Sequence, residues 1–252
     1  MEHIPPKSFF VKEHRENLIK VPSCDLHNQD KSTDDEYIRA ILLQHINLHN
    51  NTNVTTLKEI NQRALTRSVK RMKIKDKHQA KIILDTIKKY EDDDIGSLKA
   101  IDELETNHNI KFGLLGLTTK KPKKEIIKNN NGEDIITSST EIDLTRIENF
   151  FIMLAKGIFY YKIGKVWQGK VNILPHFLFN ESTATDYDKF LNEKYLEYFN
   201  KENSEGENKD FFYFDGYNEI NPKTKKQDCI FFIFCFYDTF KITSIFPIES
   251  NI

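Results

Sequence analysis

Apolar residues recur at helical spacing in several stretches of the chain, and these stretches predict a small helical layer. The Thr-Asp-Asp-Glu sequence at residues 33–36 matches a capping box, so we expect the first helix to begin at Thr33. Two further helical patterns cover about residues 54–72 and 76–90. The N-terminal half of the chain is therefore expected to contain three helices.

A stronger helical pattern covers residues 143–163 and predicts the main helix of the C-terminal half. Its apolar residues fall on one face: Ile147, Phe150, Phe151, Leu154 and Ile158. Gly157 would allow another element to approach this helix closely, because glycine has no Cβ atom. A shorter helix is expected over residues 187–199.

The pattern changes after residue 210 and indicates β-strands. Three runs dense in Phe, Tyr, Ile and Cys cover residues 211–217, 228–237 and 240–246. Their density on consecutive positions favours a sheet covered on both faces over an exposed base-stacking surface. We therefore predict an α+β fold in which an antiparallel sheet of about three strands packs on the helix at 143–163.

The charges of the chain nearly cancel, with 37 Lys and Arg residues against 38 Asp and Glu residues and a formal net charge of −1. This balance argues against a protein that coats polyanions with its whole surface, so a nucleic-acid contact would need a local basic patch. Every apolar run is far shorter than the ~20 residues of a membrane-spanning helix, so we expect no membrane contact. The 3 cysteines lack framework spacing and favour a cytoplasmic setting.

The residues with the most suggestive chemistry lie near the N-terminus. Glu2 and His3 precede Ile-Pro-Pro-Lys, and Val-Pro-Ser-Cys-Asp-Leu-His-Asn occupies residues 21–28, after a short strand expected at residues 18–21. A carboxylate and an amide can hold a hard divalent cation, while a neighbouring imidazole can deprotonate a water molecule. Such an ion offsets negative charge on a phosphoryl group.

Taken together, these two sequences resemble the HNH endonuclease family, most closely a bacterial branch with Glu-His-Ile-Pro-Pro-Lys and Val-Pro-Ser-Cys-x-x-Cys-Asn motifs. The resemblance implies a ββα-metal unit over residues 1–50, which would hydrolyse nucleic-acid phosphodiesters with Mg²⁺ or a similar ion. DNA is the expected substrate. Residues 51–252 would then form an accessory α+β domain, with helices over 54–90.

The resemblance also assigns roles to individual residues. His3 matches the general base, and Asn17 matches the residue that orients the loop. Glu2 and Asn28 match the metal ligands. In the family, two cysteines of a structural zinc site stand at the positions that are here Cys24 and His27.

That zinc site is expected to be incomplete in this chain. The family's first Cys-x-x-Cys pair precedes the Glu-His pair, whereas Met1 directly precedes Glu2 here. Structural zinc needs four ligands, so we expect the zinc to be lost. The resemblance thus predicts an N-terminally truncated or degenerate nuclease, weak or inactive as written.

Basic residues cluster on the helix expected over residues 54–72. Arg63, Arg67 and Lys70 fall on one face of it, and Arg71 follows directly. Such a stripe either tracks nucleic-acid phosphates or forms an ordinary solvated face, and the sequence leaves both interpretations open.

Two functions follow from these observations. The leading hypothesis is an HNH-type, metal-dependent endonuclease. The alternative is a non-catalytic nucleic-acid-binding or protein-interaction protein that descends from such a nuclease. Metal-dependent cleavage separates the two.

Overall fold

The chain has an α+β fold, as predicted, and divides into two compact units. The first unit comprises Met1–Leu42, Asn50–Thr55 and Thr145–Ile252, and the second comprises Leu43–His49 and Thr56–Leu144. The computed structural model describes residues 1–23, 25–43, 45, 48, 51–59, 77–90, 99–100, 103–104, 107–108, 123–128, 134–139, 142–179, 184–220 and 225–248. The domain boundary predicted at residue 50 follows from the family resemblance. The division into compact units does not test it, so it stays a prediction.

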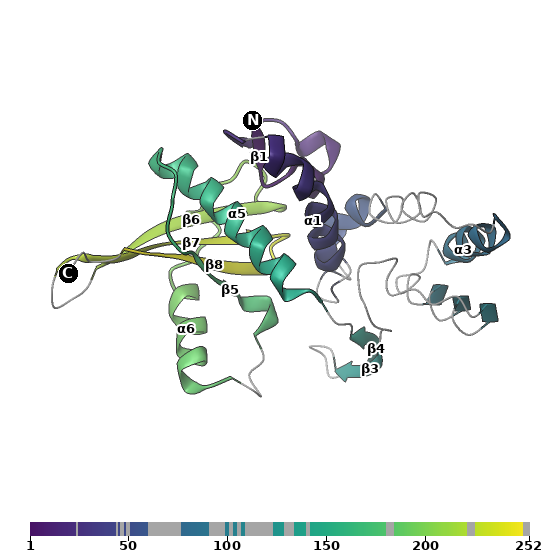
Figure 1. The fold of residues 1–252 in the computed structure, drawn as a ribbon. Coiled ribbons are helices and arrows are strands. Elements are labelled where there is room, and N and C mark those ends of the chain that lie inside the picture. Colours follow the sequence, from purple (N-terminus) through teal and green to yellow (C-terminus); the bar gives the residue numbers. More distant parts are fainter. Residues whose placement is uncertain are drawn as a thin grey trace. The chain divides into compact units, whose positions relative to one another are not determined.

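The described part of the chain contains both helices and antiparallel strands (Figure 1). The α-helices are α1 (Asp25–Leu43), α3 (Lys77–Lys89), α5 (Leu144–Ile163) and α6 (Asp186–Leu196). The strands are β1 (Glu2–Ile4), β2 (Ile19–Val21), β3 (Lys123–Lys128), β4 (Asp134–Ser139), β5 (Asn172–Pro175), β6 (Phe212–Ile220), β7 (Gln227–Phe236) and β8 (Phe240–Pro247). Short 3-10 helices occupy Lys7–Phe9, Lys12–His14, Thr52–Val54 and His176–Leu178.

The core of the first unit is a four-stranded antiparallel sheet with the strand order β5-β8-β7-β6. Strands β6, β7 and β8 confirm the three predicted aromatic strands. Strand β5 was not expected, because its four residues are too few to show a period and end in a proline. The aromatic residues of β7 are buried, which agrees with a covered sheet rather than an exposed stacking surface.

The two faces of the sheet are covered by different helices, and residue alternation along β7 decides which residues face each one. Phe232, Phe234 and Phe236 point to the side of α5, where Phe151 and Phe159 pack against them with ring centroids 6.0–6.4 Å apart. Phe231 points to the opposite face, where its ring packs against the Tyr195 ring of α6 with centroids 4.9 Å apart. Figure 1 shows α5 lying across the sheet.

The N-terminal segment packs on the same core within the first unit. The Phe9 ring is fully buried, 5.4 Å from the Phe150 ring of α5 and 5.2 Å from the Phe236 ring of β7. Ile4 of β1 is also buried and lies directly over Gly157 of α5. The close approach predicted for Gly157 is therefore confirmed, and Ile4 is the residue that makes it.

Gly157→Val is expected to destabilise the protein by about 1–3 kcal/mol, because overpacking a closed core costs this much. A Cβ atom at residue 157 would lie 2.0 Å from the Cδ1 atom of Ile4, so the buried Ile4 side chain would have to move. Urea unfolding measures the loss. Adding Ile4→Ala should recover part of the stability, whereas additive losses from the two substitutions would contradict the contact.

The predicted start of the first helix at Thr33 is wrong, because α1 already begins at Asp25. The expected capping box lies inside the helix. Asp34 serves a tertiary ion pair instead, accepting a hydrogen bond of 2.7 Å from the Nε atom of Arg146 in α5.

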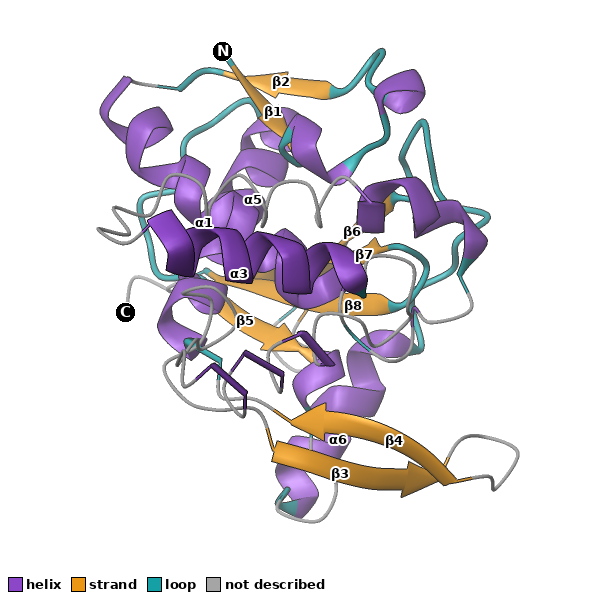
Figure 2. Cartoon of the chain, turned by 90° about the vertical axis from the view of Figure 1, so that its right-hand side faces the viewer, coloured by secondary structure: helices purple, strands orange, loops and turns teal. Residues whose placement is uncertain are grey.

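The second unit contains an amphipathic helix and a separate hairpin. Helix α3 confirms the helix predicted over residues 76–90, and it buries Ile83 against Leu104. Strands β3 and β4 form a two-stranded antiparallel hairpin (Figure 2). The pairing of β3 with β4 satisfies backbone hydrogen-bonding groups of both strands.

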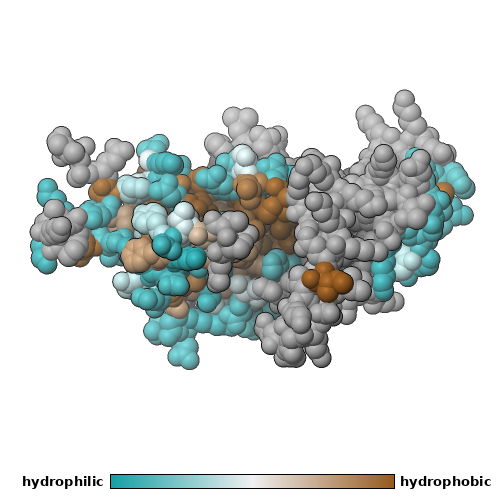
Figure 3. Space-filling view, turned by 90° about the horizontal axis from the view of Figure 1, so that it is seen from below, coloured by the Kyte–Doolittle hydropathy of each residue, from teal (hydrophilic) through white to brown (hydrophobic). Residues whose placement is uncertain are grey.

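None of the described helices is both long enough and apolar enough to cross a membrane. Hydrophilic residues cover much of the described surface seen in Figure 3, with hydrophobic residues between them. Of the helix predicted over residues 54–72, only residues up to 59 are described, and these are helical from Thr55.

Candidate active-site hairpin and adjoining cavity

The N-terminal segment forms a hairpin of two short antiparallel strands followed directly by a helix. Glu2 pairs with Val21, His3 with Lys20 and Ile4 with Ile19. The short strand predicted at residues 18–21 is confirmed as β2, and α1 follows it. The chain order is therefore strand, strand, helix, with the predicted general base on the first strand.

His3 lies on the face of β1 opposite to Ile4, because neighbouring residues of a strand point to opposite faces. Its side chain is half-buried, and its Nδ1 atom is buried without a hydrogen-bond partner in the described part of the chain. Burial, together with the positive charges of Lys7 and Lys20, lowers the pKa of His3 below its usual value. At neutral pH the imidazole is thus neutral and able to accept a proton.

Asn17 lies in the connection between the two strands, in the left-handed backbone region with φ of 55°. Asparagine adopts this conformation more readily than most residues, which suits the tight turn into β2. Its side chain lines a cavity together with Ile4 and Pro5. Strand alternation places Glu2 on the Ile4 face of β1, so the described geometry does not bring Glu2 and His3 together on one face.

The other predicted site residues lie partly or wholly outside the described residues. His27 and Asn28 belong to the backbone of α1, but their side chains are not among those described. Cys24 lies outside the described residues, as do the predicted nucleic-acid-binding residues Arg63, Arg67, Lys70 and Arg71. Their roles therefore stay predictions.

Among the side chains that the structure describes, no three His, Cys, Asp or Glu residues converge on a metal-sized site. Cys229 and Cys235 are both buried on β7 as free thiols. Burial raises the pKa of each to about 12, and the Glu219 carboxylate beside Cys229 contributes to that shift. Zinc binds the thiolate form, so neither cysteine is suited to complete the predicted zinc site.

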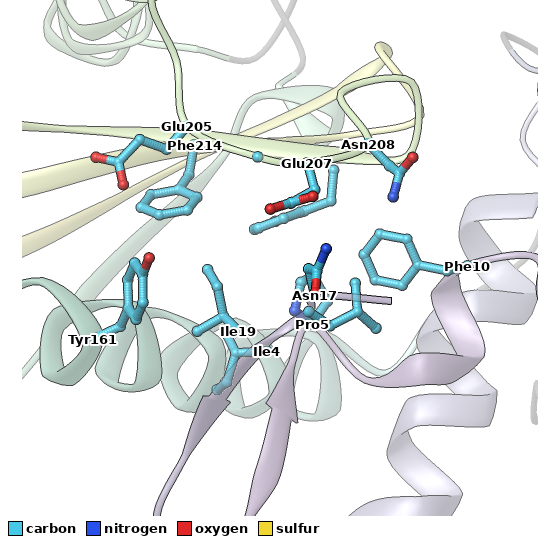
Figure 4. Close-up of a pocket in the computed structure, with 13 residues that line it drawn as sticks. Ile4, Pro5, Phe10, Asn17, Ile19, Tyr161, Glu205, Glu207, Asn208 and Phe214 are labelled. Carbon is cyan, nitrogen blue, oxygen red and sulfur yellow. The ribbon is translucent and has the colours of Figure 1, made fainter. Parts of the chain in front are cut away.

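A cavity of about 350 Å³ adjoins the hairpin within the first unit. Hydrophobic side chains form most of its wall, and four polar residues reach it (Figure 4). The polar residues are Asn17, Glu205, Glu207 and Asn208. Sequence reasoning identified only Asn17 of these, because a loop far along the chain brings the other three to the hairpin.

A second histidine of the first unit, His176, is also half-buried. It begins a 3-10 helix, and both of its ring nitrogens have partners. Nδ1 lies 2.5 Å from the Oδ1 atom of Asn192, and Nε2 lies 2.7 Å from the Oγ1 atom of Thr243. The ring therefore joins α6 to β8, and burial lowers its pKa.

Stability is expected to fall as the pH drops below about 6.5, the usual pKa of histidine. Because burial lowers the pKa of His176 in the folded protein, the unfolded chain takes up a proton first, which favours unfolding. Urea unfolding at about pH 7.5 and about pH 5.5 should show a smaller pH effect for His176→Gln. Exposed His14→Gln should leave the effect unchanged, and an equal effect in all three proteins would contradict the argument.

Similarity to other proteins adds no assignment to this site. The chain matches no family model, no curated protein and no solved structure. The functional argument therefore depends on the residues of the hairpin, the helix that follows it and the adjoining cavity.

Proposed function

We propose that the protein is an HNH-like, metal-dependent endonuclease that hydrolyses nucleic-acid phosphodiesters. The observation that carries the proposal is the strand–strand–helix order of β1, β2 and α1, with a neutral, half-buried His3 on the first strand. By the family resemblance, Asn17 would orient the loop and Asn28 would be a metal ligand.

His3 would act as the general base. Its lowered pKa keeps the imidazole unprotonated at neutral pH, so a ring nitrogen can take a proton from the attacking water molecule. Lys7 and Lys20, whose charges reach the ring, would also attract the phosphate backbone towards it. The same two lysines thus support both the protonation state of the base and the approach of its substrate.

The donor chemistry of the predicted ligands suits a hard divalent ion. Glu2 offers carboxylate oxygens and Asn28 an amide oxygen, the types of ligand that Mg²⁺ prefers. On β1, Glu2 lies on the face opposite to His3, so the ligand role of Glu2 depends on the family resemblance and not on the described geometry. A bound ion would supply positive charge that offsets the developing charge on the phosphate.

A plasmid-nicking assay tests the proposal directly. Cleavage of supercoiled DNA is expected with Mg²⁺ or Mn²⁺ and is expected to stop when a chelator removes the ion. The assay should cover about pH 6 to about pH 9, which includes both protonation states of an ordinary histidine. The absence of metal-dependent cleavage over this whole range, with RNA as well as DNA, would overturn the proposal.

The competing function is nucleic-acid or protein binding without catalysis. A gel-shift experiment on the same DNA distinguishes it from the enzyme. Salt-sensitive binding without metal-dependent cleavage would favour this alternative, because phosphate contacts weaken as counterions compete.

A further inference from the structure

We propose that the cavity beside the hairpin binds an organic cation, a protonated amine carried on a small apolar body. Aromatic side chains form much of its wall, and Figure 4 shows Phe214 of β6 opposite Tyr161 of α5 with Phe10 at one end. Phe212 of β6 also lines the cavity. Ile4 of β1 contributes aliphatic surface. Such a wall favours an apolar ligand, and aromatic faces also attract a cation.

The charged residues that line the cavity are both acidic. Glu205 is already engaged by the ammonium group of Lys162. Glu207 makes no hydrogen bond or ion pair with any residue that the structure describes, and Figure 4 shows its carboxylate over the cavity near Asn17. A ligand with a positively charged nitrogen would therefore find an available counter-charge at the mouth of an apolar space.

The remaining polar groups fit the same ligand. The Nδ2 atom of Asn208 donates to the carbonyl oxygen of His14, 3.4 Å away, which holds this side chain at one end of the cavity. Asn17 adds a second side-chain amide to the cavity wall. An ammonium group would therefore meet the Glu207 carboxylate and two amides as the polar part of this wall.

The volume of the cavity limits the size of the ligand. About 350 Å³ lies near the lower end of the range of small-molecule sites, about 300–1,000 Å³. A single ring or a short chain with one ammonium head fits this space, whereas a nucleotide with its charged phosphate would meet the repulsion of Glu207. The cavity shares Asn17 with the proposed nuclease site but not the proposed base, because Ile4 lines the cavity while His3 lies on the opposite face of β1.

Isothermal titration calorimetry of the whole chain with 2-phenylethylamine tests the proposal. The uncharged analogue 2-phenylethanol serves as the comparison. We expect saturable binding of the amine and about three- to fivefold weaker binding of the alcohol, since Glu207 is exposed and an exposed ion pair is worth up to about 1 kcal/mol. A lysine side chain of another protein carries the same chemistry as a free amine. Titration with Nα-acetyl-lysine amide therefore distinguishes a lysine side chain from a free amine as the ligand. Binding of either amine more tightly than the uncharged alcohol supports the proposal.

The variant Glu207→Gln removes the counter-charge with little change in shape. It should bind the amine about three- to fivefold more weakly and the alcohol as well as the wild type does. Glu202→Gln, which alters an exposed carboxylate of the same segment away from the cavity, should behave as the wild type. Failure of the amine to bind, or equal binding of amine and alcohol, would overturn the proposal, and unchanged unfolding curves would show that both variants fold.

Discussion

Replacing His3 with alanine is expected to lower metal-dependent phosphodiester cleavage by about 10²- to 10⁴-fold, the usual contribution of a positioned general base. The proposed function assigns His3 the proton of the attacking water, and no other imidazole lies on the described hairpin strands. Single-turnover cleavage of a labelled duplex measures the chemical step and separates it from binding. The gel shift should change little, because the imidazole is neutral when the substrate binds.

The pH profile supplies a second readout for the same residue. Since burial and two lysines lower the pKa of His3, the wild-type cleavage rate should hold as the pH falls to about 6.5 and decline only below it. His3→Ala should lose this decline together with the activity. His14→Ala, which removes an exposed imidazole from the same segment, should keep both. Equal rates for the wild type and His3→Ala would exclude His3 as the base.

Long elements with a strong hydrophobic period were predictable from the sequence. Helix α5 was expected at residues 143–163 and occupies Leu144–Ile163, because its apolar face alone selects a helix of that length. Strands β6 and β7 were equally clear, since consecutive aromatic residues require cover on both faces. Here local pattern and tertiary burial favour the same structure.

Short elements depended on partners that lie far away in the sequence. The turn from β7 to β8 places Tyr237 in the left-handed backbone region, with φ of 54°, where a bulky residue is rare. Burial of its ring and a hydrogen bond of 3.2 Å from the Asn51 amide to its carbonyl oxygen hold it there. No local propensity contains that information.

The candidate site was predictable only as far as one continuous segment supplies it. The family resemblance implied two strands followed by a helix over this segment, and β1, β2 and α1 follow one another in that order. The adjoining cavity was not predictable, because Glu207 reaches it through a loop before β6. That loop has an ordinary polar sequence with Gly206 at φ of 144°, which marks a turn but not a ligand site.

Phe151→Ala is expected to cost about 3–5 kcal/mol of unfolding free energy, a larger loss than the one expected for Gly157→Val. The Phe151 ring is fully buried between α5 and the sheet, with ring centroids 5.3 Å from Phe150 and 6.0 Å from Phe234. Truncation leaves a cavity that neighbouring rings, themselves held by the sheet, are unable to fill. Urea unfolding followed by circular dichroism measures the loss.

Phe190→Ala is the matched control, because it removes the same atoms from a ring that is 56% exposed on α6. Its effect should stay within about 0.5 kcal/mol, as for other exposed positions. The difference between the two variants isolates the packing of α5 on the sheet from the general effect of losing a phenyl ring. Similar losses from both variants would mean that α5 does not cover this sheet. They would also contradict the packing of Ile4 and the hairpin on α5.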